Sequence, residues 1–137
     1  MTNRKMTIVA VLLIVALCIR IGVYKYNEAQ PDTSDIPADV QISAMAILET
    51  YESNEPHAND LYLNKYVDVT GTIAKIVTDE KCSLYLKTNS MLGFVIAELS
   101  DCSSASDIRE GSSVTVRGLC SGYLSDVILV RSVLANS

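Results

Sequence analysis

Apolar residues dominate the start of the chain, where residues 6–19 carry no charge and directly follow Arg4 and Lys5. A helix over this run is about 21 Å long, and continuing it to Val23 gives about 27 Å, close to the roughly 30 Å of a bilayer core. A cleavable signal peptide has the same basic start, but no small-x-small cleavage site follows the run. The pattern therefore favours an uncleaved signal anchor, a transmembrane helix over residues 1–26.

The basic residues around this run bear on its orientation. Arg4, Lys5 and the terminal amine lie on one side, and Arg20 and Lys25 lie on the other, so the charge bias is small. The very short N-terminal tail is easily retained in the cytoplasm. We expect a single-pass protein of the cell inner membrane whose C-terminal domain is extracytoplasmic, in the periplasm.

A polar stretch and a helical pattern follow. Residues 27–39 hold two prolines and are typical of a linker, which leaves residues 40–137 for one domain. Asp39 is placed to cap an amphipathic helix over residues 40–52, and residues 54–64 predict a short helical turn or loop. The expected buried face of the helix recurs at helical spacing and consists of Ile42, Met45, Ala46, Leu48 and Tyr51.

From Lys65 onward the apolar period changes to two, which predicts strands. Residues 102–110 have room for one or two helical turns, which Gly111 would end. Gly71 and Gly118 are natural bend points within the first and fourth strands. Five strands with a short helix between strands three and four predict a mainly β domain, the Greek-key barrel called the OB-fold. The expected strands cover residues 65–76, 83–87, 92–99, 113–119 and 126–134.

Four segments of this domain resemble the bacterial tRNA-anti-like group of OB-fold domains. They are residues 51–55, 66–71, 114–123 and 126–129, and the Gly-x-Cys-x-Gly-Tyr motif at 118–123 is the most specific. The resemblance covers about residues 42–134 and implies the fold and its topology, but it transfers no functional site. Members often follow an N-terminal membrane or signal segment. Ser132 departs from the group, in which cysteine is frequent at that position.

Charge restricts the functions open to this domain. Residues 28–137 hold all sixteen acidic residues and seven of the eleven basic ones, for a net charge of −9. Such a domain repels phosphate backbones, which argues against nucleic acid as a partner. His57 is the single histidine, and no catalytic or metal-ligating set surrounds it, so we expect neither an enzyme nor a cofactor.

OB-folds bind ligands on strands two and three and in the flanking loops. Aromatic rings there can serve as stacking platforms, with lysines as basic partners. In the alternative interpretation, which the negative charge favours, Phe94 belongs to the core and Tyr85 is a half-buried strand residue. The candidate binding residues are Tyr85, Phe94, Lys75, Lys81, Lys87 and Tyr123.

Three cysteines lie in this domain, and Cys18 lies in the apolar run. An odd number allows at most one intramolecular disulfide. A bond between Cys102 and Cys120 is one possibility in an oxidising compartment, and three buried free thiols, Cys82 included, is the other. Neither arrangement suggests metal binding, since no pair has C-x-x-C spacing.

Together these patterns favour a non-catalytic, membrane-tethered OB-fold module that binds a protein, peptide or glycan on the extracytoplasmic side. The alternative is a domain that binds single-stranded nucleic acid. That alternative follows from fold analogy alone, and it needs a local basic stripe across strands two and three.

Overall fold

The structure is a computed structural model that describes residues 2–26 and 32–135. These residues fall into two compact units, within Met1–Pro31 and within Asp32–Ser137, and each is described by itself. Residues 27–31, part of the predicted linker, lie outside the described residues.

The first unit is one helix, α1 (Thr2–Tyr26). Its side chains from residue 3 to residue 24 are all exposed, and most of them are apolar. Within α1, the 22 residues Asn3–Tyr24 are long and apolar enough to cross a bilayer. The predicted helix is therefore present, and it has the composition of a membrane anchor or a signal sequence.

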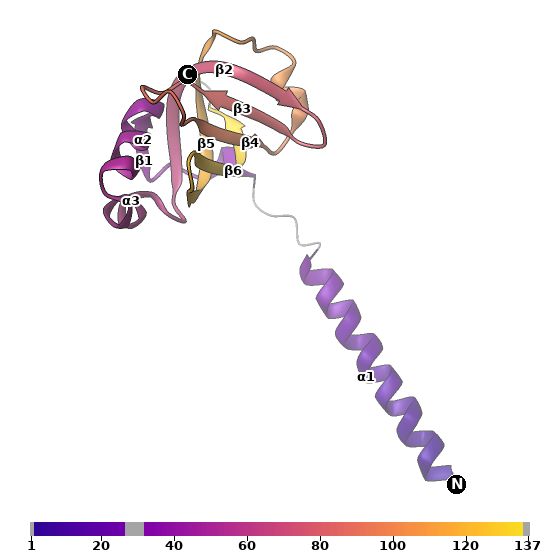
Figure 1. The fold of residues 1–137 in the computed structure, drawn as a ribbon. Coiled ribbons are helices and arrows are strands. Elements are labelled where there is room, and N and C mark those ends of the chain that lie inside the picture. Colours follow the sequence, from indigo (N-terminus) through magenta and orange to yellow (C-terminus); the bar gives the residue numbers. More distant parts are fainter. Residues whose placement is uncertain (1, 27–31, 136–137) are drawn as a thin grey trace. The chain divides into compact units, whose positions relative to one another are not determined.

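The second unit is a closed β-barrel (Figure 1). Neighbouring strands within the barrel are antiparallel except for the parallel pair β4–β6, and pairing of β2 with β5 closes the barrel. A short 3-10 helix, η2 (Cys102–Ala105), connects β4 to β5. This arrangement is the predicted OB-fold with its helix between the third and fourth barrel strands. The strands are β2 (Tyr66–Thr78), β3 (Cys82–Leu86), β4 (Val95–Leu99), β5 (Ser113–Tyr123) and β6 (Val127–Leu134).

The segment before the barrel differs from the prediction of one helix over residues 40–52. Its first four residues form β1 (Val40–Ser43), which pairs in parallel with β2, and the helix α2 (Ala44–Ser53) begins only after them. Ser43 caps α2, since its Oγ accepts a hydrogen bond from Ala46 N at 3.2 Å. Asp39, the predicted cap, instead accepts one from Tyr66 N at 3.1 Å. Pairing with a distant strand has overridden the local helical pattern.

Helix α2 buries a face that is rotated from the predicted one. Ala44, Ile47, Leu48 and Tyr51 are buried at helical spacing, whereas Met45 is 48% exposed. A second helix, α3 (Glu55–Tyr62), follows after Asn54, and α2, α3 and β1 lie together on one side of the barrel (Figure 1).

Two of the predicted glycine roles change in the structure. A Cβ at Gly71 would lie 3.0 Å from Ala44 Cβ, so Gly71 lets α2 approach β2, and the irregularity of β2 falls between Ile73 and Lys75 instead. Gly111 has a φ of +87°, but η2 has already ended at Ala105, so Gly111 serves a turn before β5 rather than a helix end.

The predicted bend at Gly118 is confirmed. The pairing of β5 with β6 shifts register between Arg117 and Leu119. A side chain at Gly118 would overlap Ser132 Oγ and come within 3.0 Å of Leu129 Cβ. Strand β5 then continues to Tyr123, four residues beyond the predicted end at residue 119.

Part of the predicted linker attaches to the barrel. Residues 33–35 form a 3-10 turn, η1 (Thr33–Asp35), and Thr33 is buried. Arg117 of β5 donates a hydrogen bond to the Ile36 carbonyl at 3.2 Å. The same guanidinium binds Asp68 of β2 through two hydrogen bonds of 2.7 and 2.8 Å.

The disulfide differs from the predicted Cys102–Cys120 pair. Cys82 at the start of β3 bonds to Cys102 at the start of η2, with their Cα atoms 5.3 Å apart. Cys120 is a buried free thiol, because its place in β5, opposite Leu129 of β6, turns it into the core. Neither alternative from the sequence described this pairing.

One apolar core joins all five barrel strands to α2 and α3. Its buried residues are Ala44, Ile47, Leu48, Tyr51, Ala58, Tyr62, Val67, Val69, Ile73, Cys82, Leu84, Leu86, Val95, Ala97, Leu99, Val116, Cys120, Val127 and Leu129.

Candidate binding face on strands β3 and β4

Strand register places one row of side chains on the outer surface of the barrel. Lys75 of β2 pairs with Tyr85 of β3, and Tyr85 pairs with Ile96 of β4, which pairs in turn with Ile128 of β6. Directly paired residues point to the same face of a sheet. The alternate residues of β3 and β4 are buried, so this row faces outward. We call it the outer face.

Two aromatic rings lie at this face. Tyr85 and Phe94 have ring centroids 5.8 Å apart and planes 75° apart, the edge-to-face arrangement that aromatic pairs favour. Phe94 is positioned by its backbone: its N–H donates to Asp126 Oδ1 at 2.7 Å, and its carbonyl accepts from Val127 N at 3.0 Å. Both residues are half-buried, so Phe94 is packed against Tyr85 rather than enclosed in the core.

The three candidate lysines lie in different surroundings. Lys75 is exposed and opposite Tyr85. Lys81 Nζ lies 3.4 Å from Glu98 Oε2, on side chains that are 75% and 34% exposed. Glu98 pairs with Ser83 and shares the outward orientation of Tyr85 and Ile96. A carboxylate on the same face therefore offsets the charge of Lys81.

Lys87 lines a different cavity, of about 280 Å³. Its other walls come from the start of α2, from β2, and from hydroxyl groups that include Thr72, Thr88 and Ser113. Lys87, which directly follows β3 in the chain, thus lines a cavity beside the start of α2.

Tyr123 is partly buried and belongs to an aromatic cluster at the core, not to the outer face. Its ring stacks on Tyr51 with centroids 5.4 Å apart, and Tyr51 also contacts Tyr62 at 6.0 Å. The Tyr51 hydroxyl lies 3.4 Å from Cys120 Sγ. Burial raises the pKa of Tyr51 well above its usual value, and the contact with Cys120 raises it further. This cluster joins α2, α3 and β5.

The sequence interpretation missed Glu98 and Ile96 as members of the outer face. Both lie in a predicted strand, and their alternation with Val95 and Ala97 is visible in the sequence. Which lysine or tyrosine stands opposite each of them depends on strand register, which alternation alone does not supply.

Other ionisable groups with displaced pKa values have local structural partners. Hydrogen bonds from Ser103 lower the pKa of Asp101, and the hydrogen bond to Asp68 raises that of Arg117. Within residues 2–26 and 32–135, no group of three or more His, Cys, Asp or Glu side chains is arranged to hold a metal ion. What the outer face offers chemically is aromatic and aliphatic contact area with the exposed Lys75 beside it.

Comparison with known proteins gives a family and a fold. The family model tRNA_anti-like matches residues 1–134. No curated protein matches the chain. Among solved structures, a lipoprotein of Klebsiella pneumoniae subsp. pneumoniae, whose name proposes that it binds nucleic acid, is similar with a TM-score of 0.61. The two share 18% sequence identity, over 74% of this chain and 100% of that one, so the likeness shows the fold alone.

Proposed function

This chain belongs to the tRNA_anti-like family, and we propose that it is a non-catalytic binding module held at a membrane by α1. The barrel binds its ligand on the outer face of β3 and β4. The ligand is a protein, peptide or glycan rather than a nucleic acid.

The observation that carries this proposal is the composition of the outer face. Tyr85 and Phe94 present an ordered aromatic pair, with Ile96 beside them. Glu98 pairs with Lys81 at the same face, where a site for a phosphate chain would keep its cations free. Aromatic and aliphatic surface with little net positive charge suits peptide side chains or sugar rings.

Two features support an extracytoplasmic position in the periplasm. The Cys82–Cys102 disulfide is typical of proteins in oxidising compartments. Helix α1 has the length and apolar composition of a single span, which suits a signal anchor in the inner membrane. A reporter enzyme that is active only in the periplasm, fused after residue 137, tests this orientation, and activity of a cytoplasm-specific reporter instead would reverse it.

Nucleic-acid binding is the second candidate, favoured by the name of the Klebsiella lipoprotein and by Lys75 beside the aromatic pair. It requires local basic charge that outweighs the net −9 of residues 28–137.

The test is a titration of residues 32–137 with labelled single-stranded DNA and RNA at low salt. This fragment is suitable because the buried side chains among the described residues lie from Thr33 to Ser132, whereas the side chains of residues 3–24 are exposed. We expect no binding. Binding that weakens with added salt and is lost in Tyr85→Ala would replace this proposal with the nucleic-acid function, since low salt favours electrostatic binding.

A further inference from the structure

Three large apolar side chains are almost fully exposed on two loops of the barrel. Met91 and Leu92, between β3 and β4, are 97% and 87% exposed, and Leu124, between β5 and β6, is 88% exposed. Single exposed apolar residues are common on protein surfaces, but several on neighbouring loops often mark an interaction site. We call Met91, Leu92 and Leu124 the loop patch.

The two loops lie side by side. Phe94 at the end of the first loop exchanges hydrogen bonds with Asp126 and Val127 at the end of the second. Gly93 fits between its neighbours: a Cβ there would lie 2.9 Å from Leu48 Cδ2 of α2 and 3.0 Å from the Ser125 carbonyl. The β3–β4 loop is therefore wedged between α2 and the β5–β6 loop.

Hydrogen bonds within the loops hold this shape. Thr88 Oγ1 donates to the Gly93 carbonyl and accepts from Ser90 N at 3.3 Å. Leu92 N lies 3.4 Å from Ser90 Oγ, and Leu124 N donates to the Asp126 carbonyl at 3.3 Å. Because the loops are already ordered, a partner that covers the patch loses little free energy in fixing them.

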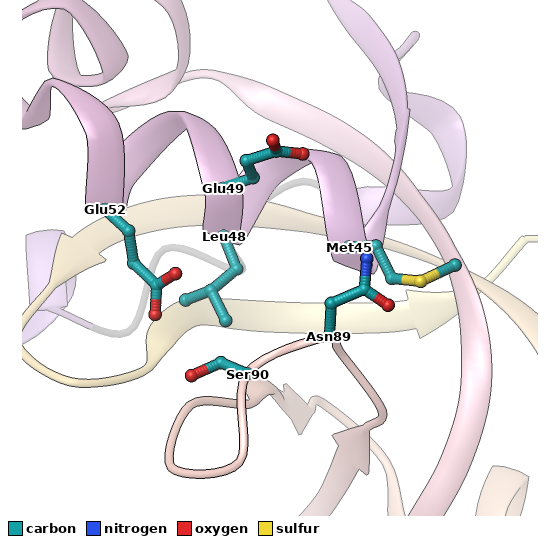
Figure 2. Close-up of a pocket in the computed structure, with 6 residues that line it drawn as sticks. All are labelled: Met45, Leu48, Glu49, Glu52, Asn89 and Ser90. Carbon is teal, nitrogen blue, oxygen red and sulfur yellow. The ribbon is translucent and has the colours of Figure 1, made fainter.

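A cavity of about 260 Å³ lies between the first loop and α2. Figure 2 shows Leu48 and Glu52 extending from α2 toward Ser90, with Met45 and Asn89 close together at the other end. Glu49 also lines this cavity. Neither Glu49 nor Glu52 takes part in the ion pairs found among residues 32–135.

Charge indicates what covers this surface. The loop patch favours a partner with apolar side chains, and the two glutamates of the adjacent cavity favour positive charge on the same partner. A second copy of this chain would bring the same negative charge, and an anionic bilayer surface would be repelled. An amphipathic segment with both leucine-like and lysine-like side chains satisfies both requirements.

We infer that the loop patch and the α2 cavity together dock a basic, amphipathic segment of a partner protein. This surface adjoins the outer face of β3 and β4 at Phe94 but uses other residues, and the inference does not depend on what that face binds.

The probe is a fluorescent peptide of leucine and lysine at helical spacing, titrated with residues 32–137 at physiological salt. We expect Met91→Ser/Leu92→Ser/Leu124→Ser to weaken its binding about tenfold, since central apolar contacts carry most interface energy. Glu49→Gln/Glu52→Gln should weaken it about threefold and remove most of its salt dependence.

Matched controls separate docking from general attraction. Asp79→Asn/Glu80→Gln removes the same charge at the β2–β3 turn, and Leu61→Ser removes an exposed leucine from α3. Both should leave peptide binding unchanged. If the controls weaken binding as much as the test variants, the attraction is non-specific and the inference fails.

Two further results would overturn the inference. The first is absence of peptide binding to the unmodified fragment. The second is stronger binding to phosphatidylcholine vesicles than to the peptide, lost in the loop-patch variant, which would make the bilayer the occupant. Folding of each variant is checked by its unfolding transition, and the outcome of the oligonucleotide titration does not affect either result.

Discussion

Two cross-strand ion pairs of the barrel join the same kinds of group in different surroundings. Arg117 and Asp68 lie directly opposite each other on β5 and β2, their closest atoms 2.7 Å apart, on side chains 23% and 8% exposed. Lys81 and Glu98 meet through one contact of 3.4 Å between side chains 75% and 34% exposed.

The difference shows what depth does to an ion pair. We call Arg117–Asp68 the inner pair and Lys81–Glu98 the outer pair. The inner pair has two parallel hydrogen bonds, and a third from Arg117 to the Ile36 carbonyl attaches the segment before β1 to the barrel. Water screens the outer pair, so its contribution to stability is small. The inner pair therefore holds β2, β5 and the segment before β1 together. The outer pair mainly reduces the net charge at the candidate binding face.

Breaking the inner pair should have the largest effect. Asp68→Ala leaves the Arg117 guanidinium partly buried without its anion, and we expect the free energy of unfolding to fall by about 3–5 kcal/mol. Urea denaturation of residues 32–137, followed by circular dichroism, measures this. Asp68→Ala/Arg117→Met, which removes both charges, should recover part of the loss. A loss below about 1 kcal/mol for the single variant would contradict the structural role.

Beside the outer pair, a disulfide bond stabilises the barrel more than the ion pair does. Cys82 adjoins Lys81, and its disulfide to Cys102 closes a loop with a sequence separation of 20. Cys82→Ser/Cys102→Ser should lower the free energy of unfolding by about 3 kcal/mol. Dithiothreitol should destabilise the unmodified fragment similarly and leave the variant unaffected. Equal stability of the two forms would show that this part of the barrel does not need the bond.

A buried contact without charge sharpens the comparison. Tyr51→Phe removes the hydroxyl beside Cys120 and should cost about 1 kcal/mol, between the effects of the two ion pairs. Because the folded pKa of Tyr51 lies above 10.0, its neutral form is favoured in the folded state. Its contribution is therefore complete below pH 10 and is lost as the pH rises further. Unfolding measured on both sides of pH 10 should show a smaller alkaline loss in Tyr51→Phe than in the unmodified protein.

The smallest effect is expected at the outer pair. Lys81→Ala should change the free energy of unfolding by less than about 0.5 kcal/mol, and high salt should abolish the difference. Lys75→Ala, at an exposed lysine of the same face, serves as the control. A loss at Lys81 comparable to that at Asp68 would remove the distinction between the two pairs.

Local patterns predicted the barrel strands because alternation needs only neighbouring residues. Residues 126–134, for example, were predicted as a strand and form β6 (Val127–Leu134). Local patterns failed at residues 40–43. The apolar residues there share the helical spacing of α2, but pairing with residues 67–70 makes this segment a strand. A partner some 27 residues away in the chain leaves no local trace.

The candidate site was predictable to a similar extent. The expected OB-fold binding surface pointed to the aromatic residues Tyr85 and Phe94, whose rings do contact each other, and Lys75 lies opposite Tyr85. Strand register decided which residues of neighbouring strands face each other, and it placed Glu98 within reach of Lys81. It also selected Cys82 for the disulfide, because the order of cysteines in a sequence does not encode which pair becomes adjacent.

Strand β2 is central to this fold in a way that exchange kinetics would reveal. Residues Val67 to Thr70 pair with β1 on one edge and with β5 on the other, and Val67 and Val69 are completely buried. Their amide hydrogens can reach solvent only when the strands on either side separate. We expect deuterium to enter this stretch last, so its exchange rate reports global unfolding. The amides of the exposed loops should exchange earlier, through local opening.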